Sequence, residues 1–468
     1  MKNKALQTAL IFAIIFACHI IVFLAFYPGM CTYDLNAQIS QYVNHEFSTS
    51  HPLLHTLFIG FFHDLFISSF NGTINLGYAI ATLIQLIIVD SAMTYSVMYM
   101  CSLCKKYIFI VCVTAFYALF PINSMLAVSH TKDTAFAAFG LIFFIDSLRI
   151  LSNNIPVRKT VFYIRVLINA VLMTLMRNNA IYAVVAALLI ITIITSRIYI
   201  SANRHNNSSQ KSINDNFIIQ RKYLFVLFLT TILSISGNHI LMKTTDATPG
   251  SIKEMMSIPA QIMGRVYNET ATDEEKGIIL QYIPNAEEYK YYISDLMKLN
   301  LPFEIWESKC KHFLLDSAII SLHHPIISIE AVWYNIQGYI DPFHMPYSSD
   351  HFYLARYDYR GDAELDSKIP QLCDTYVRLF RTTEAYSHSP IVIPFNLAIY
   401  VWICIISFVF VIRKHFKKSK ENTYIAFIFP LLYFMTLLLG PAAIMRYGYL
   451  YVLLAPVSIS IILCSSKS

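Results

Sequence analysis

Charged residues are scarce in this chain of 468 residues. Asp, Glu, Lys and Arg together make up 14% of the sequence, whereas hydrophobic residues make up 56%. Soluble globular domains contain roughly 25% charged residues, so this composition cannot cover a water-exposed surface. The mean hydropathy of +0.52 supports the same conclusion. The scarcity of charge excludes a soluble enzyme and a disordered scaffold.

Cysteine and glycine are also few, with nine and 13 residues, whereas phenylalanine and tyrosine number 33 and 31. The cysteines are mostly spread through apolar runs, which gives no disulfide framework, and the CxxC of Cys101 and Cys104 has no second pair with which to bind a metal ion. The net charge of +6 does not indicate nucleic acid, because Lys and Arg form short clusters between apolar runs, as topology signals do. We therefore expect an aromatic-rich polytopic membrane protein.

The apolar runs predict an all-α fold of about ten transmembrane helices. A bilayer core about 30 Å thick requires roughly 20 apolar residues in a helix. The predicted spans are 5–27, 74–101, 107–128, 133–151, 161–176, 179–199, 223–241, 391–412, 424–441 and 447–465. The first run lacks a small-residue cleavage site, so we interpret it as an uncleaved anchor.

The run 52–70 is nearly long enough to span but contains His55, His63 and Asp64. If it does not cross, all basic clusters fall on one side, as the positive-inside rule requires. These clusters are Lys2/Lys4, Lys105/Lys106, Arg149/Arg158/Lys159/Arg165, Arg197/Arg204/Lys211/Arg221/Lys222 and Arg413/Lys414/Lys417/Lys418/Lys420. We therefore predict an interfacial or re-entrant helix at 52–70. Both termini are then expected in the cytoplasm.

The same topology divides the chain into three parts. Residues 1–241 form an N-terminal transmembrane module, whose first outer loop is 28–73, and residues 391–468 form the C-terminal transmembrane helices. The long loop 242–390 is expected outside the plasma membrane. It is richer in acids than in bases, and its helix-like pieces predict a mostly helical external domain.

Polar residues of the first outer loop follow the helical spacing i, i+4, i+7 and i+11: Asp34, Gln38, Gln41 and His45. On a helix they share one face, while apolar residues such as Leu35 and Ile39 lie on the other. The bland interpretation is the solvated face of a surface helix. The loop, however, has acids but no Lys or Arg, and it contains a turn at Ser50-His51-Pro52. These features favour a site that presents a carboxylate, amides and an imidazole to a cleft.

Two further turns on the same predicted side contain unusual cations. Lys132 precedes Asp133, which is suited to cap the next helix, and the ammonium group can either reach a phosphate or snorkel to the interface. Arg177 is followed by Asn178 and Asn179. An arginine on the side depleted of positive charge needs an anionic or structural partner, while the asparagines alone are also explained by helix capping.

Arg446 and Arg265 complete the set of candidate cations. Arg446 precedes Tyr447 at the outer end of the last span, where an aromatic belt explains the tyrosine but not the arginine. Arg265 lies in the long loop, and its forked guanidinium group suits oxyanions. The pair His323-His324 lacks a third ligand at usable spacing, so we predict no metal site.

Within the spans, two acids call for an explanation, because intramembrane acids are costly and often functional. Asp90 lacks a partner nearby in sequence, while Asp146 has Arg149 one helical turn away and is expected to pair with it.

Four cations are thus expected to converge with Asp34 on one face: Lys132, Arg177, Arg265 and Arg446. Charge clamps of this kind neutralise a leaving phosphate, and a carboxylate base accepts the proton of an attacking hydroxyl.

At these residues the sequence resembles the GT-C superfamily of integral-membrane glycosyltransferases. More narrowly, it resembles an uncharacterised group of polytopic membrane proteins of low-GC Gram-positive bacteria. The matching positions, in order, are Pro28-Gly29, Asp34, Gln38, His51-Pro52, Lys132-Asp133, Arg177-Asn178-Asn179, Pro259, Gln261, Arg265 and Arg446-Tyr447. The order of these elements is more specific than any one of them.

The resemblance implies transfer of a sugar from a polyprenyl-phosphate donor to an extracytoplasmic cell-envelope glycan or polymer. Asp34 takes the place of the superfamily's first-loop carboxylate, and the substrate-binding residues are then Gln38, Gln41, His51, Lys132, Asp133, Arg177, Asn178, Arg265, Arg446 and Tyr447. Many such enzymes have adjacent acids in this loop, whereas here the next acid is Glu46. No cofactor is predicted with certainty, and a divalent cation remains an option.

Two other functions fit the same composition. A glycan ligase or polymerase would depend on loop residues such as Arg265 and His324 more than on Asp34. A transporter or flippase for an envelope precursor would use Asp90 as a buried coupling site and would show related halves, for which the sequence gives no internal repeat.

Overall fold

The computed structural model describes residues 2–70, 74–104, 106–204, 210–299, 303–343, 365–385, 390–418 and 422–465, and every regular element in this part of the chain is helical. The elements of the main bundle are α1 (Lys2–Ala25), α4 (Ile74–Leu103), α5 (Tyr107–Leu119), α6 (Pro121–Ala127), α7 (Lys132–Leu151), α8 (Lys159–Met176), α9 (Asn178–Arg204), α10 (Gln210–Thr245), α17 (Leu397–Lys418), η4 (Thr423–Phe427), α18 (Ile428–Leu437) and α19 (Tyr449–Ser465). This all-helical architecture confirms the predicted fold class.

Seven helices in the described residues are long and apolar enough to cross a membrane: α1, α4, α7, α8, α9, α10 and α17. An eighth span results if α5 and α6, which meet at a bend of 50°, are counted as one. The two remaining predicted spans contain shorter apolar helices, at Thr423–Leu437 and Tyr449–Leu463. Within the described residues, fewer helices are long enough to cross a membrane than the ten that hydropathy predicts.

Pro121 explains why the predicted span 107–128 is not one straight helix. Proline has no backbone N–H and disfavours helical geometry in the residue before it. Phe120, with ψ of 120°, accordingly leaves the helical region, and Pro121 begins α6 at its first turn. The connection after α6 is thereby directed toward the end of the bundle where the first loop lies.

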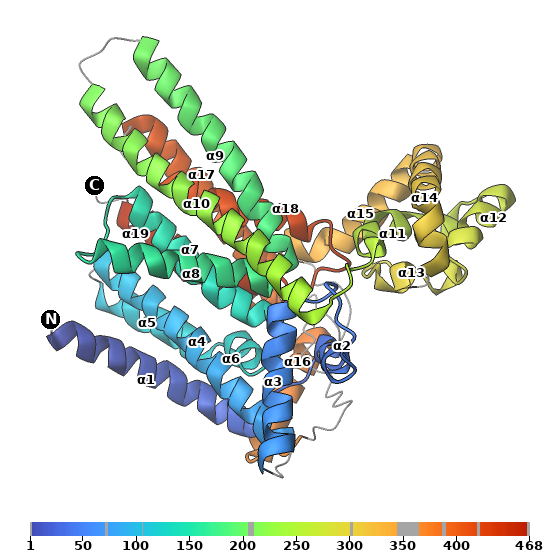
Figure 1. The fold of residues 1–468 in the computed structure, drawn as a ribbon, viewed down its shortest axis with the longest axis horizontal. Coiled ribbons are helices and arrows are strands. Elements are labelled where there is room, and N and C mark those ends of the chain that lie inside the picture. The colour runs from blue at the N-terminus through green and yellow to red at the C-terminus, as the bar shows by residue number, and fades with distance from the viewer. Residues whose placement is uncertain are drawn as a thin grey trace.

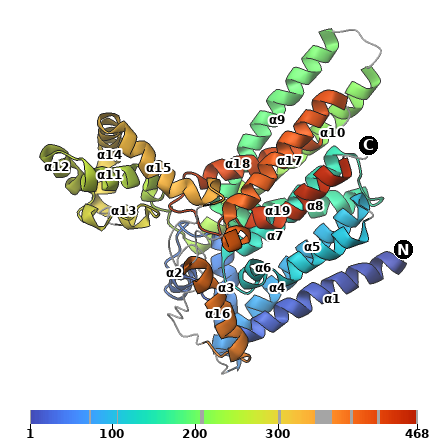
Figure 2. The ribbon, with the colours of Figure 1, turned by 180° about the vertical axis from the view of Figure 1, so that it is seen from behind.

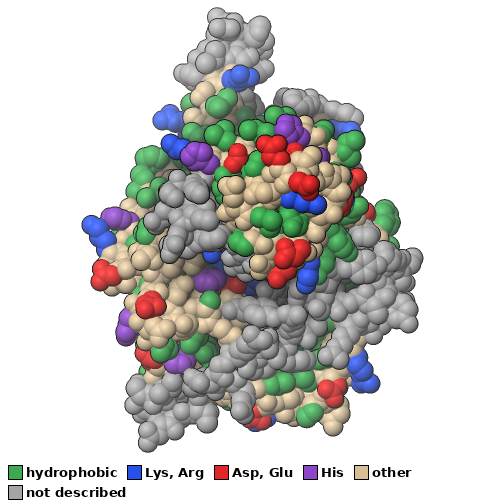
Figure 3. Space-filling view, turned by 90° about the vertical axis from the view of Figure 1, so that its right-hand side faces the viewer, with side chains coloured by type: hydrophobic (Ala, Val, Ile, Leu, Met, Phe, Trp, Pro, Cys, Tyr) green, Lys and Arg blue, Asp and Glu red, His purple; other side chains and the backbone are tan. Residues whose placement is uncertain are grey.

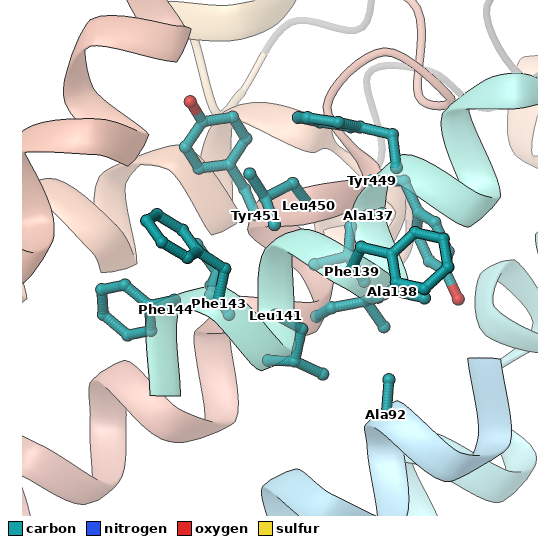
Figure 4. Packing of buried hydrophobic residues seen from close by; sticks show 14 of the residues in the cluster. Ala92, Ala137, Ala138, Phe139, Leu141, Phe143, Phe144, Tyr449, Leu450 and Tyr451 are labelled. Atoms are coloured by element: carbon teal, nitrogen blue, oxygen red, sulfur yellow. The ribbon is translucent and has the colours of Figure 1, made fainter. Parts of the chain in front are cut away.

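Helix α7 lies at the centre of the bundle. In Figure 4, Phe139, Leu141 and Phe143 of α7 lie between Ala92 of α4 and the stretch Tyr449–Tyr451 at the start of α19. Helices at the periphery instead expose large apolar side chains, including Leu6, Leu10, Ile14, Ile193 and Ile235. An apolar perimeter around a closely packed centre is the surface that a lipid bilayer requires.

Both chain termini and the adjoining ends of α9 and α10 lie at one end of the bundle (Figures 1 and 2). Most of the basic clusters are on helix ends that point the same way, such as those with Arg149, Arg197 and Arg413. Helices α2 (Tyr33–Val43), α3 (Leu53–Phe70) and α16 (Pro370–Ala385) lie at the opposite end. The helix predicted at 52–70 therefore lies beside α2, at the end away from both termini.

A second hydrophobic core lies beyond this end, in what we call the α11–α15 unit. The unit comprises η1 (Ile252–Met256), α11 (Ser257–Glu269), α12 (Asp273–Tyr282), η2 (Ala286–Glu288), α13 (Asp295–Leu299), α14 (Phe303–His323) and α15 (Pro325–Ile340). On the face of the unit that is seen in Figure 3, basic and acidic side chains lie among one another. The described part of the range 242–390 is mostly helical, as expected for the predicted loop domain, whereas residues 300–302, 344–364 and 386–389 lie outside the described residues.

The unit is joined to the bundle through the connection between α18 and α19, residues 438–448. Three carbonyl oxygens of this connection accept hydrogen bonds from the unit. The Ser294 N–H donates to Pro441 at 2.8 Å. The Asn335 side-chain amide donates to Gly440 at 2.9 Å, and the Tyr339 hydroxyl donates to Ala442 at 3.1 Å. The connection continues to Arg446, so one segment links the unit to the site described next.

Candidate functional site: a buried ionic cluster

The first loop is fixed against the connection between α6 and α7 by backbone hydrogen bonds. The Met30 N–H donates to the Val128 carbonyl at 2.9 Å, and the His130 N–H donates to the Met30 carbonyl at 2.8 Å. Gly29, at a φ of 131°, allows the close approach, because a Cβ there would collide with the side chains of Thr82 and His130. The chain then enters α2, which brings Asp34 next to the start of α7.

The start of α7 differs in detail from the sequence-based expectation. Thr131, rather than Asp133, is the N-cap residue, and its hydroxyl oxygen accepts from the Asp133 N–H at 3.3 Å. Asp133 is therefore available to accept from another group. Lys132, the first residue of α7, does not snorkel but reaches toward the first loop.

Five charged side chains from distant parts of the chain meet here, and we call them the Asp34 cluster: Asp34, Lys132, Asp133, Arg177 and Arg446. The Lys132 ammonium group donates to Asp34 Oδ2 at 2.5 Å, and Arg446 Nη1 donates to the same oxygen at 3.0 Å. Arg177 pairs with Asp133, whose second oxygen is 3.8 Å from Arg446 Nε. The cluster contains three cations and two carboxylates, so one positive charge is in excess.

Aromatic rings enclose the two guanidinium groups. The Arg177 carbon Cζ lies 4.8 Å from the ring centroid of Tyr447 and 5.6 Å from that of Tyr433, and Arg446 Cζ lies 5.0 Å from the Tyr447 ring. Such faces attract cations while excluding water. The Arg446 and Arg177 side chains are accordingly only 2% and 8% exposed.

The Asp34 carboxyl group remains ionised in spite of its surroundings. Burial opposes its ionisation, but the positive charges of Arg446, Lys132 and His51 together hold its pKa well below the usual 3.8. A carboxylate whose two nearest partners are cations is a weak proton acceptor in this state. Displacing those partners with another anion would raise its pKa.

Polar side chains of α2 and α3 border the cluster. The Gln38 side chain bonds His55 and Thr56, at 3.0 Å each, and is buried rather than solvated. Gln41 donates to the Ser50 hydroxyl at 3.4 Å, and His51 Nδ1 lies 3.4 Å from the Lys132 ammonium group. Asp34 and Gln38 of the predicted polar stripe thus face inward, whereas the bond between Gln41 and Ser50 is exposed. The helix ends at Val43, so His45 lies beyond it.

Asn178, the residue that follows Arg177, fixes the far part of the first loop. Its side-chain amide donates to the Thr49 carbonyl oxygen at 2.8 Å. The same loop is tied to the chain after α10, because the Thr49 N–H donates to the Thr248 carbonyl at 2.9 Å. The Arg177–Asn178 turn therefore supports the site from two directions, through one ion pair and one loop contact.

Arg265 is not part of the Asp34 cluster, contrary to the predicted convergence of four cations. It lies in the α11–α15 unit, where its Nη2 donates to Glu330 at 2.6 Å and lies 3.2 Å from Glu269. Its Cζ is 4.8 Å from the ring centroid of Tyr334. Both carboxylates are about 40% exposed, so this arginine is paired at the surface of the unit.

The histidines of the α11–α15 unit also have structural partners. His323 Nδ1 and His324 Nε2 lie 3.1 and 3.0 Å from the two carboxylate oxygens of Glu275, which belongs to the capping box at the start of α12. In the described residues, no group of three or more His, Cys, Asp or Glu side chains is placed to hold a metal ion.

Inside the bundle, two buried acids have partners that the sequence did not reveal. Asp90 Oδ1 lies 2.6 Å from His19 Nδ1, and both side chains are fully buried. Asp146 accepts from Arg165 and Tyr95 at 2.6 Å each. Arg149, the expected partner of Asp146, instead lies over the rings of Tyr95 and Tyr99.

His55 is the site residue that sequence reasoning did not select. It lies one helical turn after His51, at the start of an apolar helix, and this spacing was the only available signal. Its significance depends on Gln38, which reaches it from another helix.

The fold and this cluster define an all-helical protein of the membrane with a buried ionic site at one end of its bundle. The family of unknown function DUF6020 matches residues 43–467. The chain therefore belongs to that family, and the matched range includes every member of the cluster except Asp34. No curated protein and no solved structure matches the chain.

Proposed function

We propose that the protein is an inverting glycosyltransferase that transfers a sugar from a polyprenyl-phosphate donor to a cell-envelope acceptor. The observation that supports this proposal is the meeting of three cations and two carboxylates in the Asp34 cluster, at an end of an apolar bundle. A lipid-linked donor reaches such a site along the bilayer. Its phosphate diester has one negative charge, which would neutralise the one positive charge in excess.

In this proposal Lys132, Arg177 and Arg446 bind the donor phosphate. When the phosphate replaces Asp34 as the partner of Lys132 and Arg446, the pKa of Asp34 rises. The carboxylate then accepts the proton of the acceptor hydroxyl while the oxygen of that hydroxyl attacks the anomeric carbon of the donor sugar. The bond between that carbon and the phosphate oxygen breaks, and the cations stabilise the charge that the leaving phosphate gains. Gln38, Gln41, His51, Asn178 and Tyr447 line or support the site.

The orientation in the membrane is part of the proposal. Basic clusters favour the cytoplasmic side, and helix ends with Arg149, Arg197 and Arg413 point to the same end as both termini. We therefore assign that end to the cytoplasm, and the Asp34 cluster and the α11–α15 unit to the outer face of the plasma membrane. Attaching a cysteine-reactive or glycosylation tag to the α11–α15 unit tests this assignment directly.

The decisive experiment uses purified protein in lipid nanodiscs with a panel of radiolabelled polyprenyl-phosphate sugars. We expect one donor to be consumed, with release of polyprenyl phosphate, when a cell-envelope polymer is added. A matched Asp34→Asn protein, equally folded by its melting curve, should leave the donor intact. Consumption at the wild-type rate in this variant would show that Asp34 is not the base.

A glycan ligase or polymerase is less well supported. That function would depend on Arg265 and His324. Arg265, however, is paired with Glu330, and His324 is paired with Glu275, both within the α11–α15 unit. Comparing single substitutions of Asp34 and His324 separates the two functions, because only a ligase or polymerase would be more sensitive to the latter.

A transporter is the second candidate, since one observation favours it. The buried pair of His19 and Asp90 is of the type that binds a proton within a bundle. Proton-coupled uptake of an envelope precursor that is lost in Asp90→Asn, without detectable sugar transfer by the wild type, would establish this function instead.

A further inference from the structure

His55 forms the end of a chain of hydrogen bonds that begins at the backbone of Pro52. The Thr56 hydroxyl donates to the Pro52 carbonyl oxygen at 3.3 Å. Since a hydroxyl has one hydrogen, Thr56 Oγ1 can only accept from its other neighbour, and Gln38 Nε2 donates to it at 3.0 Å. The direction of the Gln38 amide group is thereby fixed.

This direction determines the position of the proton on His55. With Gln38 Nε2 turned to Thr56, the carbonyl oxygen Oε1 faces His55 Nδ1 at 3.0 Å. An amide oxygen only accepts, so the hydrogen of the imidazole must be on Nδ1. In the neutral ring, Nε2 then has a lone pair and no hydrogen.

His55 Nε2 is buried and has no hydrogen-bond partner among the described residues. The residue is 2% exposed, and buried polar atoms without a protein partner need an explanation. Burial, with Lys132 and His130 next in importance, holds the pKa of His55 down to about 3. The ring is thus neutral in the physiological range, and its lone pair is available.

The surroundings of His55 place it against the Asp34 cluster. Lys132, His130, Asp34 and His51 all act on it electrostatically. His51, one helical turn earlier, has its Nδ1 3.4 Å from the Lys132 ammonium group, which ties this part of the chain to the cluster. A ligand that enters the cluster can bind Nε2 only if it brings a hydrogen-bond donor, because a lone pair cannot bind another acceptor. A phosphate diester has no hydrogen to donate, whereas a sugar has several hydroxyl groups.

We propose that His55 binds the substrate, with Nε2 accepting a hydrogen bond from a sugar hydroxyl group. This inference rests on the proposed function and deepens it, since it divides the site into a phosphate-binding part, formed by the cations, and a hydroxyl-binding part, formed by His55 and oriented by Gln38 and Thr56. The hydroxyl belongs either to the sugar of the donor or to the acceptor.

The test compares wild-type protein with His55→Asn in nanodiscs. The asparagine amide can occupy the place of Nδ1–H and keep the bond to Gln38, while Nε2 is removed. His63→Asn, on the same helix α3 and also buried, is the matched control for folding. The probes are farnesyl phosphates that bear glucose, galactose, mannose or N-acetylglucosamine, and farnesyl methyl phosphate, which has the same charge but no hydroxyl.

We expect His55→Asn to weaken binding of the preferred sugar-bearing lipid by about three- to tenfold, the effect of one neutral hydrogen bond. Binding of farnesyl methyl phosphate should stay within twofold, and His63→Asn should match the wild type. The affinity for a methyl glycoside, used as the acceptor, is measured with farnesyl methyl phosphate present. If His55→Asn lowers this affinity but not the affinity for the sugar-bearing lipid, the hydroxyl belongs to the acceptor.

Two outcomes overturn the inference and can be told apart. If the wild type prefers a sugar-bearing lipid and His55→Asn retains this preference and the acceptor affinity, His55 does not bind a hydroxyl, although the proposed function stands. If the wild type binds none of the lipids, the proposed function fails, and the inference fails with it.

Discussion

Arg265 and Arg446 are both arginines at the same end of the molecule, yet their surroundings have opposite charge. Arg265 lies between two half-exposed carboxylates, Glu269 and Glu330, so its group has one negative charge in excess. Arg446 shares Asp34 with Lys132 and lies near the pair of Asp133 and Arg177, so its group has one positive charge in excess. Residue type alone therefore does not identify an anion site.

The comparison also separates the two groups by burial. Arg446 is enclosed by Tyr447 and the bundle, where charge interactions are strong because water is excluded. The partners of Arg265 are in contact with water, which weakens their attraction. An anion should therefore bind more tightly in the Asp34 cluster than beside Arg265. Four experiments test this contrast.

The largest expected effect comes from Asp34→Asn. The substitution keeps the shape of the side chain and removes the proposed proton acceptor, so sugar transfer should fall by about a hundredfold to ten-thousandfold. The measurement is the rate of donor consumption in nanodiscs. Glu46→Gln, which changes the next acid along the same loop, is the control and should retain the wild-type rate.

Arg446→Met and Arg265→Met test the two arginines against each other. The first removes one cation of the proposed phosphate site, so affinity for farnesyl methyl phosphate should fall by about ten- to a hundredfold. The second should leave this affinity unchanged, because Arg265 is already neutralised by two carboxylates. Equal losses in both variants would contradict the assignment of the phosphate to the Asp34 cluster.

Lys132→Met tests the electrostatics of the cluster through pH. In the wild type the depressed pKa of Asp34 keeps the carboxylate ionised, so its contribution to stability is present above about 3.8 and is lost only as the pH falls through the lower, native value. Removing Lys132 raises this pKa. The acid limb of a melting-temperature profile should therefore move to higher pH, whereas Lys276→Met, in α12, should leave it in place.

The smallest effect is expected at the Arg265 pair itself. Its partners are half-exposed, so the coupling energy between Arg265 and Glu330 should be no more than about 1 kcal/mol. A double-mutant cycle with Arg265→Met and Glu330→Gln, followed by the melting temperature, measures it. A much larger coupling would mean that this pair is as strongly enclosed as the Asp34 cluster.

Hydropathy predicted the helical class and most spans but not their continuity. A window of side chains identifies apolar runs, yet Pro121 divides one of them through its backbone, since it cannot donate the hydrogen bond that a straight helix needs. In the predicted span 424–441, the α-helical part is only Ile428–Leu437, preceded by the 3-10 helix Thr423–Phe427. Backbone geometry, rather than polarity, decides such boundaries.

For the site, the pattern of charges in the sequence predicted which residues lie at the same end of the bundle. It did not predict which of them are in contact. Asp34 and Arg446 are 412 residues apart, and they meet because α2 and the connection 438–448 both lie against the start of α7. Helical spacing suggested Arg149 for Asp146, but packing of α8 against α7 supplies Arg165 instead. His55 was missed for the same reason, since its role depends on Gln38 of another helix.

The connection 438–448 has a mechanical consequence. Three of its carbonyl groups accept hydrogen bonds from the α11–α15 unit, and a few residues later Arg446 pairs with Asp34. If the protein is the glycosyltransferase proposed above, a glycan chain that tilts the unit would move residues 438–448 and change the contact between Arg446 and Asp34. Binding at the unit would then alter the Asp34 cluster through this short stretch of backbone.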